Sequence, residues 1–249
     1  MFDAAPSVDR QAVQTALASQ AAAAQTSVHQ ATVHYLTPPP ASPAADKLVT
    51  LPVATSAAKR AVDVAVASLA LLVFLPLLLV IAIAVRLESR GPALFRQRRT
   101  GLNGKVFTIF KFRTMTVAED HGEIRHATKN DARITPLGLV LRKCSLDELP
   151  QLINILLGHM SVVGPRPHAI SHDEHYGARI PTYHQRFRAR PGLTGNAQVR
   201  GFRGEVHDLK CMVDRVQADN DYIEGWSLRR DLWIMLCTVP LMFRDPNAY

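Results

Sequence analysis

The chain has 249 residues, of which 47% are hydrophobic, enough to build the core of one large domain or two small ones. Its formal net charge of +8 indicates an acidic partner, such as nucleic acid, an anionic membrane surface or a phosphorylated substrate. Nucleic acid is disfavoured because only 6% of the residues are aromatic and no recognisable binding motif occurs. The three widely spaced cysteines, Cys144, Cys211 and Cys237, favour a reducing setting over a disulfide framework.

Residues 1–58 differ in composition from the rest of the chain. They consist largely of Ala, Gln, Ser, Thr and Pro, and of the 29 Lys and Arg residues only Arg10 and Lys47 precede residue 59. Such a segment cannot bury enough apolar surface to offset the entropy lost on ordering. We therefore predict that residues 1–58 form a disordered low-complexity tail.

Residues 64–85 are an uncharged apolar run that would extend about 33 Å as a straight helix, roughly the thickness of a bilayer core. Pro76, near its middle, removes a backbone hydrogen bond and kinks the helix. Both flanks are basic, with Lys59 and Arg60 before the run and several arginines after it, which places both ends in the cytoplasm. A hairpin that enters and leaves the same leaflet satisfies both observations. A straight spanning helix with a tolerated proline is the alternative.

The dipeptide Asn103-Gly104 lies between two β-prone runs and predicts a β-hairpin, with its second strand at residues 106–112. Side chains alternate along a strand, so Lys111 and Arg113 point to the same face. A charged pair on a strand is commonly just its solvent-exposed face. The other interpretation is a pair that contacts phosphate groups.

Two adjacent carboxylates, Asp147 and Glu148, precede a predicted helix that begins near Pro150 and ends at Gly158. A helix N-terminus favours anions, so we expect both acids to be ionised. A purely structural alternative exists, because Ser145 and Glu148 have the spacing of a capping box. Pro150 weakens it, since its missing N–H would fall inside a helix capped at Ser145.

The segment Pro165-Arg166-Pro167 holds an arginine on a stiff backbone, which suits binding of a phosphate or a nucleotide, although a structural turn is the alternative. The histidines that follow, including His168, match no metal-binding motif and are interpreted as solvated or hydrogen-bonding residues. Near the C-terminus, "WSLRRDLWIMLCTVPLMF" combines two tryptophans with an apolar stretch too short to span a bilayer. It predicts an interfacial helix, and a core helix is the alternative.

The membrane run, then "LRKCSLDELPQLINILLGHMSVVGPRP", then "RPGLTGNAQVRGFRGE" follow one another in uninterrupted order over residues 57–249. Together they resemble the bacterial sugar transferase family, the monotopic polyprenyl-phosphate phosphoglycosyl transferases. The resemblance implies transfer of a sugar-1-phosphate from a UDP-sugar to undecaprenyl phosphate, with release of UMP. It also implies a location on the cytoplasmic face of the bacterial inner membrane.

The resemblance further implies roles for single residues. Asp147 would be the nucleophile that forms a covalent phosphosugar, and Glu148 would help to hold Mg²⁺, the expected cofactor. The expected phosphate-binding residues are Lys111 and Arg142, with Arg113 added as the strand neighbour of Lys111, and the expected nucleotide-binding residues are Pro165, Arg166 and Pro167.

The predicted fold is α+β and mainly helical: a monotopic membrane protein with a proline-broken re-entrant helix, a small hairpin or sheet, and interfacial amphipathic helices. The hairpin would occupy residues 59–90 and the cytoplasmic catalytic domain residues 91–249. Expected partners are a UDP-sugar, undecaprenyl phosphate and membrane lipid, but no nucleic acid, and a homodimer is left open. The stretches "GPRPHAISHDEHYG" and "QVRGFRGE" resemble members that start exopolysaccharide with glucose. A galactose-1-phosphate transferase and a non-catalytic membrane scaffold are the alternatives.

Overall fold

The computed structural model describes residues 51–116, 131–202, 204, 206 and 208–244, all within one compact unit. The predicted tail lies outside the described residues except for residues 51–58, which form α2 (Pro52–Thr55) and the start of α3 (Ala57–Glu88). Pro52 suits the first turn of α2, and the Ser56 side chain accepts a hydrogen bond from the Lys59 backbone N–H at the start of α3. Helical structure therefore begins before the predicted boundary at residue 59.

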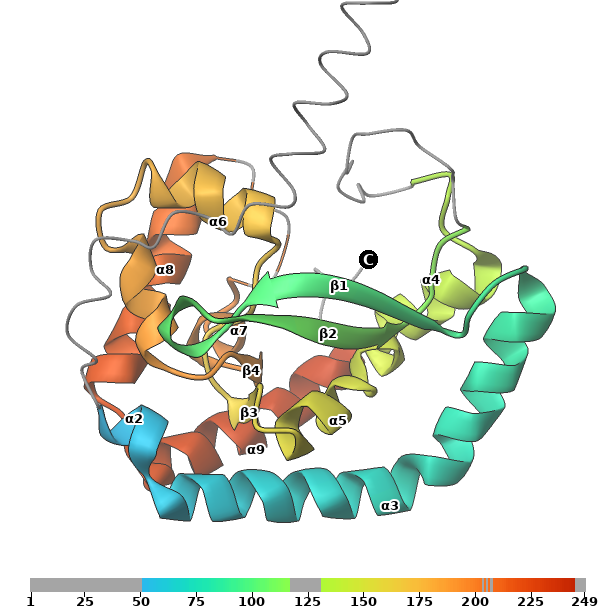
Figure 1. Ribbon diagram of the computed structural model, residues 1–249, viewed down its shortest axis with the longest axis horizontal. Coiled ribbons are helices and arrows are strands. Elements are labelled where there is room, and N and C mark those ends of the chain that lie inside the picture. Colours follow the sequence, from blue (N-terminus) through green and yellow to red (C-terminus); the bar gives the residue numbers. More distant parts are fainter. Residues whose placement is uncertain (1–50, 117–130, 203, 205, 207, 245–249) are drawn as a thin grey trace, which may run out of the picture. The chain divides into compact units, whose positions relative to one another are not determined.

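Helix α3 is long and apolar enough to cross a membrane, by its length and composition. It bends along its length (Figure 1), and Pro76 lies inside it, where a proline kinks a helix. Ala67, Ile81 and Val85 face the rest of the protein and are buried. Most of its other large apolar side chains are exposed, among them Leu69, Leu72, Val73, Leu79, Val80, Ile83 and Leu87. An apolar surface of this size is typical of a membrane-associated protein.

The β-hairpin predicted from Asn103-Gly104 is confirmed. Strand β1 (Leu94–Thr100) pairs antiparallel with β2 (Val106–Phe112), and the turn between them, η2 (Leu102–Gly104), has positive φ at both Asn103 and Gly104. Phe107 and Ile109 of β2 are buried in the main core. Lys111 extends from the same face. The interpretation of that face as solvent-exposed is therefore wrong.

The carboxylate pair lies between two short helices. The first, α4 (Pro136–Lys143), is capped by Thr135, whose side chain accepts from the Gly138 backbone N–H at 2.9 Å. A single 3-10 turn, η3 (Leu146–Glu148), follows, and α5 (Gln151–Leu156) comes next, with Pro150 at its N-cap. The chain leaves α5 at Gly158, where φ is +81°.

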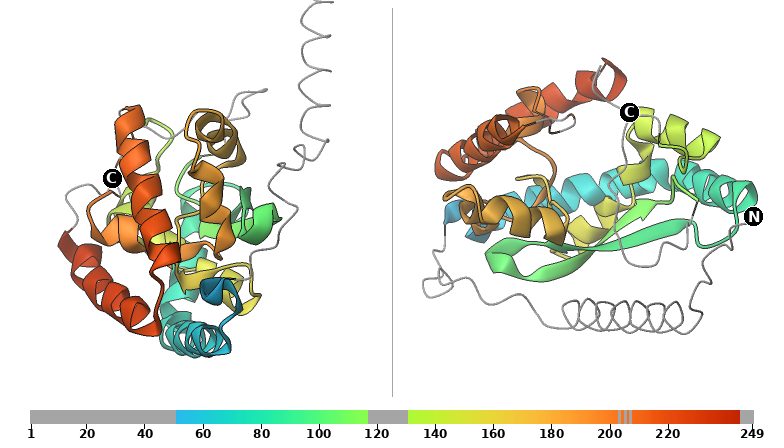
Figure 2. Two further views of the ribbon diagram at one scale, coloured as in Figure 1. Left: turned by 90° about the vertical axis from the view of Figure 1, so that its left-hand side faces the viewer. Right: turned by 90° about the horizontal axis from the view of Figure 1, so that it is seen from above.

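The second half of the chain builds a small parallel sheet and covers it with helices (Figures 1 and 2). Strand β3 pairs parallel with β4. The main core joins Ile109, Ile155, Tyr222 and Ile234, from four different elements, with Met160, which lies between α5 and β3. The protein is thus mainly helical with two small sheets, as predicted. The remaining elements are β3 (Ser161–Val163), α6 (Ile170–Gly177), η4 (Tyr183–Arg188), β4 (Gly192–Thr194), α7 (Asn196–Val199), α8 (Leu209–Glu224) and α9 (Leu228–Arg244).

Helix α9 is the C-terminal helix for which an interfacial position was predicted. Ile234 and Asp231 are buried on its inner side, whereas Trp233, Leu236 and Val239 are exposed on its outer side. The second tryptophan of the predicted pair, Trp226, is half-buried and donates its indole N–H to Asp231 Oδ2 at 3.0 Å. The outer side of α9 thus adds to the exposed apolar surface of α3.

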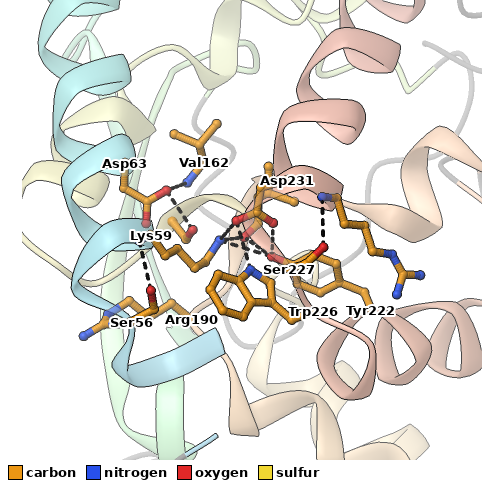
Figure 3. Close-up of polar contacts among 12 residues, drawn as sticks. Ser56, Lys59, Asp63, Val162, Arg190, Tyr222, Trp226, Ser227 and Asp231 are labelled. Atoms are coloured by element: carbon orange, nitrogen blue, oxygen red, sulfur yellow. Dashed lines mark hydrogen bonds and ion pairs between the residues drawn. The ribbon is translucent and has the colours of Figure 1, made fainter. Parts of the chain in front are cut away.

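The N-terminal part of α3 is attached to the domain by a buried polar network (Figure 3). The Lys59 ammonium lies 2.7 Å from Asp231 Oδ2 and also donates to the Val163 carbonyl and to the Tyr222 hydroxyl. One turn further along α3, Asp63 accepts from the Ser161 hydroxyl and the Val162 backbone N–H, each at 2.9 Å. This network joins α3 to β3, α8 and α9.

The other end of α3 is attached to the same unit. The Arg113 guanidinium donates to the carbonyls of Val85, Ser89 and Arg90 at the end of the helix. These carbonyls lack partners within the helix, so a cationic donor there satisfies them and complements the helix dipole. Both ends of α3 are therefore bound to the domain that carries the carboxylate pair.

Candidate active site

Asp147 and Glu148 lie on η3, directly after Ser145, which has a left-handed backbone with φ +54°. A non-glycine residue in this region stores strain, and such strain is common at functional sites. The Ser145 side chain makes no capping hydrogen bond with the described residues. The capping box is therefore not formed, and the chain turns sharply just before the two carboxylates.

Glu148 is held by two cations from distant parts of the chain. Its Oε1 lies 2.7 Å from Lys111 Nζ and 2.5 Å from Arg166 Nη2, while its Oε2 lies 3.2 Å from Arg166 Nη1. Burial disfavours the Glu148 anion, but Arg166 and Lys111 outweigh it and hold the pKa of this carboxyl well below its usual value. Glu148 is therefore a fixed, ionised carboxylate.

Asp147 has a different environment from that of its neighbour. Among the described residues, no hydrogen bond or ion pair involves its half-buried carboxylate. Burial, followed by the charge of Glu148, raises the pKa of Asp147 to about 6, although Lys111, Arg142 and Arg166 act in the opposite direction. The pair lies just ahead of α5, as predicted, but the pKa of Asp147 is raised and not lowered there. At pH 7 Asp147 is still roughly 90% ionised.

Arg142, in the last turn of α4, is the third cation at this site. Its charge lowers the pKa of Asp147, and its half-buried guanidinium has no hydrogen bond or ion pair with any of the described residues. Lys111, Arg142 and Arg166, all predicted site residues, therefore converge on the two carboxylates. Three cations around one free carboxylate favour binding of a phosphorylated group.

Arg113 does not join this cluster. Its side chain is buried and is bonded to the carbonyls at the end of α3. The alternation of side chains places Arg113 on the same face as Lys111, but it lies beyond the last residue of β2 and reaches the neighbouring helix instead. The structure thus assigns Arg113 a role in attaching α3.

Asn154 fixes the relative position of the carboxylate pair and Lys111. This fully buried residue of α5 accepts from the Phe110 backbone N–H at 3.0 Å and donates to the Thr108 carbonyl at 2.7 Å. It thereby pairs with the edge of β2 as a neighbouring strand would. Asn154 is not among the predicted site residues, and its one signal in the sequence is a polar residue within the apolar stretch "LINIL".

The Pro165–Pro167 segment follows β3 and is held by its backbone carbonyls. The Gly192 backbone N–H donates to the Pro165 carbonyl at 2.9 Å, and Arg186 Nη2 donates to the Arg166 carbonyl at 2.7 Å. A side chain at Gly192 would place its Cβ 2.1 Å from the Gly164 backbone nitrogen, so only glycine allows this approach. Because its backbone is fixed in this way, Arg166 can meet Glu148 with little further loss of entropy.

The described residues leave the apolar helix α3 largely uncovered, which indicates a membrane-associated protein. The domain attached to it holds a free carboxylate among three cations, which is typical of an enzyme for phosphorylated substrates. Residues 54–245 match the family model described as bacterial sugar transferase. The chain belongs to this family, and the predicted resemblance is confirmed.

Three relatives show how far the similarity extends. The UDP-glucose:undecaprenyl-phosphate glucose-1-phosphate transferase of Caulobacter vibrioides is 54% identical over 197 residues, which cover 79% of this chain and 74% of that protein. The protein of the same name from Klebsiella pneumoniae is 50% identical, over 77% of this chain but only 41% of its own length. The exopolysaccharide production protein ExoY of Rhizobium meliloti is 42% identical, over 77% of this chain and 88% of that protein.

Proposed function

We propose that this protein transfers glucose-1-phosphate from UDP-glucose to undecaprenyl phosphate and releases UMP, as the first membrane step of exopolysaccharide synthesis. The names of its relatives support the substrates and the pathway. The observation that carries the chemistry is the contrast between the two carboxylates. Glu148 is held by Lys111 and Arg166, whereas Asp147 has no hydrogen-bonding or ionic partner among the described residues and is free to attack.

The reaction has two steps, and each forms one bond to the β-phosphorus and breaks another. In the first, an Asp147 carboxylate oxygen attacks the β-phosphorus of UDP-glucose, the bond between that phosphorus and the bridging oxygen breaks, and UMP leaves with the bond electrons. In the second, a phosphate oxygen of undecaprenyl phosphate attacks the same phosphorus and displaces Asp147. The product is undecaprenyl diphosphate glucose, and the carboxylate is restored.

The cations of the site suit the charges in these steps. Arg142 would bind the pyrophosphate, since no described residue occupies its guanidinium, while Lys111 and Arg166 lie where they can reach both Glu148 and a phosphate oxygen. They are fixed before substrate binds, so their stabilisation of developing charge costs no reorganisation. The Pro165–Pro167 segment would present Arg166 to the nucleotide.

The residues also fit Mg²⁺, the expected cofactor. No cluster of three or more metal-ligating side chains occurs among the described residues, but Mg²⁺ is commonly held by one or two carboxylates together with substrate phosphates. Within the described part of the chain, Glu148 Oε2 receives only the longer 3.2 Å bond from Arg166 and keeps an acceptor position for the ion. When bound, Mg²⁺ would neutralise charge on the pyrophosphate.

The Glu148→Gln variant is expected to raise the Mg²⁺ concentration needed for half-maximal UMP release at least tenfold, because the neutral amide is a poor ligand for the ion. The measurement is the rate of UMP release as a function of MgCl₂ concentration, with a sample in EDTA giving the rate without Mg²⁺. Glu224→Gln is the matched control, since it removes a carboxylate paired with Arg188 on the surface. An unaltered Mg²⁺ dependence in Glu148→Gln would show that Glu148 is not a ligand.

We also propose that α3 is a re-entrant hairpin, with the domain on the cytoplasmic face of the bacterial inner membrane. Lys59 near its start and the carbonyls near its end are both bonded to the domain. A straight helix across a bilayer core of about 30 Å would leave only one end within reach of that domain. The bend of α3 and its basic flanks support the same arrangement.

In cells, single cysteines introduced by Ala58→Cys and Arg90→Cys are expected to react with a membrane-impermeant maleimide only after the inner membrane is made permeable. Both positions are exposed: Ala58 is the second residue of α3, and Arg90 lies two residues beyond its end. The native cysteines Cys144, Cys211 and Cys237 are first replaced by serine. Labelling of the two sites from opposite sides of the membrane would refute the hairpin.

The proposed function is tested by UMP release from purified protein with undecaprenyl phosphate, Mg²⁺ and a panel of UDP-sugars. We expect UDP-glucose to be used best. A preference for UDP-galactose would reassign the sugar while keeping the chemistry. A protein that binds membranes but releases no UMP from any UDP-sugar would be a scaffold, and the proposal would fail.

A further inference from the structure

Each of the three backbone carbonyls in the Pro165–Pro167 segment accepts a hydrogen bond from a different element. Two of the bonds come from the Gly192 backbone N–H of β4 and from the Arg186 guanidinium of η4. The third comes from Arg99 of β1, whose Nη1 lies 3.2 Å from the Pro167 carbonyl oxygen. Since proline has no N–H, carbonyls are the main groups through which such a backbone can be held. Arg99 is thus the side chain that ties this segment to the β-hairpin.

Arg99 and Lys111 lie on the same face of the β-hairpin. Arg99 is directly opposite Phe107 in the ladder, and opposed residues of an antiparallel pair point to the same face. Phe107 and Lys111 are four residues apart on β2, so they share that face as well. One face of the hairpin therefore presents Lys111 to Glu148 and Arg99 to the Pro167 carbonyl.

The two cations that hold Glu148 are connected through Arg99. Lys111 Nζ and Arg166 Nη2 approach the same oxygen, Glu148 Oε1, at 2.7 and 2.5 Å. Lys111 belongs to the hairpin itself, whereas Arg166 belongs to the segment that Arg99 binds at the next residue, Pro167. The position of one cation relative to the other therefore depends on the bond from Arg99.

The Arg99 guanidinium is itself held in one orientation. Its Nη2 donates to Gln97 Oε1 at 2.5 Å, while its Nη1 donates to the Pro167 carbonyl. The backbone of Arg99 also forms an isolated antiparallel bridge with Ala169, two residues after the segment. Burial, followed by the charge of Arg166, lowers the pKa of Arg99 to about 10, so the group is still charged at pH 7. A charged donor with a fixed planar fork holds a carbonyl firmly.

We propose that Arg99 is a positioning residue for the transfer reaction: by holding the Pro167 carbonyl, it sets Arg166 against Glu148, opposite Lys111. This inference rests on the proposed function, because the place of Arg166 matters for turnover only if this cation acts on the substrate phosphates. Arg99 acts without touching the substrate. A displacement of about 1 Å in a group that binds the reacting phosphate can lower the rate about a hundredfold.

The test is a double-mutant cycle of Arg99→Gln and Arg166→Gln, measured as kcat/KM for UMP release from UDP-glucose. We expect Arg99→Gln to lower kcat/KM at least about tenfold and Arg166→Gln to lower it about a hundredfold or more. Because Arg99 acts through Arg166, the double variant should lie within about threefold of Arg166→Gln. Arg98→Gln is the matched control, since Arg98 is exposed on the opposite face of β1 and should be replaceable without loss.

Arg99→Lys provides a conservative variant. Lysine keeps a cation that can donate to the Pro167 carbonyl but loses the fork that also binds Gln97, so its kcat/KM should lie between those of Arg99→Gln and wild type. Among the described residues no ion pair involves Arg99, so its replacement leaves no carboxylate without a partner. The Tm of the Arg99 variants, which shows that they are folded, should therefore stay within a few degrees of wild type.

An NMR measurement reports on the same contact without turnover. The Nε–Hε signal of Arg166 in detergent micelles, identified by its loss in Arg166→Gln, should shift in Arg99→Gln and stay in place in Arg98→Gln. A wild type that releases no UMP would refute the proposed function, yet the Arg166 signal would still depend on Arg99. The two failures are therefore distinguishable.

A folded Arg99→Gln protein with the turnover of wild type would overturn the proposal, and so would an Arg166 signal that Arg99→Gln leaves in place. A further loss of about tenfold or more in the double variant would also overturn it, because Arg99 would then act on the substrate or on the whole fold. If Arg99→Gln does not fold, the cycle and the NMR measurement are made with Arg99→Lys, and the same outcomes decide.

Discussion

Asp147→Asn is expected to reduce UMP release from UDP-glucose by a factor on the order of 10⁴ or more, because an amide cannot form the covalent phosphosugar. The same loss should appear in the first half-reaction, measured without undecaprenyl phosphate as a burst of UMP. In the wild type, UMP release should decline as the pH falls through about 6, since the raised pKa of Asp147 means that its carboxylate is protonated below that pH. A variant that keeps about 1% of the activity, or an acid limb well below pH 6, would contradict the assignment of the nucleophile.

The Asn variant should also be more stable than the wild type at neutral pH. The folded protein holds Asp147 with a pKa of about 6, above its ordinary value of 3.8, so the folded state binds more protons than the unfolded state between these values. This contribution to stability is present at low pH and is lost as the pH rises through about 6. At pH 7.5 the Asn variant should therefore gain about 1–3 kcal/mol in the free energy of unfolding.

That gain is measured as the difference in Tm between the Asn variant and wild type. The difference should shrink as the pH is lowered towards 4, where both proteins carry a neutral side chain at position 147. A variant that is inactive but more stable cannot have lost activity through misfolding. If it were instead less stable at pH 7.5, Asp147 would have a structural partner.

Lys59→Met should destabilise the protein by about 3–5 kcal/mol, because it leaves Asp231 buried without its cation. Both side chains of this pair are at most 5% exposed, and Asp231 also accepts from Tyr222 and Trp226 (Figure 3). For a domain of this size the loss corresponds to a fall in Tm of roughly 6–20 °C. The measurement is thermal unfolding of the detergent-solubilised protein.

The double variant Lys59→Met with Asp231→Asn should recover part of the loss, since no unpaired charge is left and the amide oxygen keeps an acceptor for either Tyr222 or Trp226. Lys210→Met is the matched control, because it breaks an exposed pair with Asp214 and should leave Tm unchanged. A Lys59→Met protein with the Tm of wild type would mean that this network does not hold α3 on the domain.

Local patterns predicted much of the fold correctly. The hairpin follows from Asn103-Gly104 and the helix at residues 151–156 from Pro150 and Gly158, because turns and helix ends depend on a few neighbouring residues. The capping box failed for a local reason as well: the left-handed backbone at Ser145 starts a separate turn in front of the carboxylates. Arg113 illustrates another limit: strand alternation groups it with Lys111, but it lies beyond the end of β2 and is bonded to the end of α3.

The sequence by itself determined the family, the carboxylate pair and the apolar helix, because each can be recognised from a short run of consecutive residues. Only the tertiary structure decided which carboxylate is free, since Glu148 receives its cations from Lys111 and Arg166, which are 37 and 18 residues away. Charges and proton positions are set by neighbours in space, and folding brings those neighbours from parts of the chain that no local pattern connects.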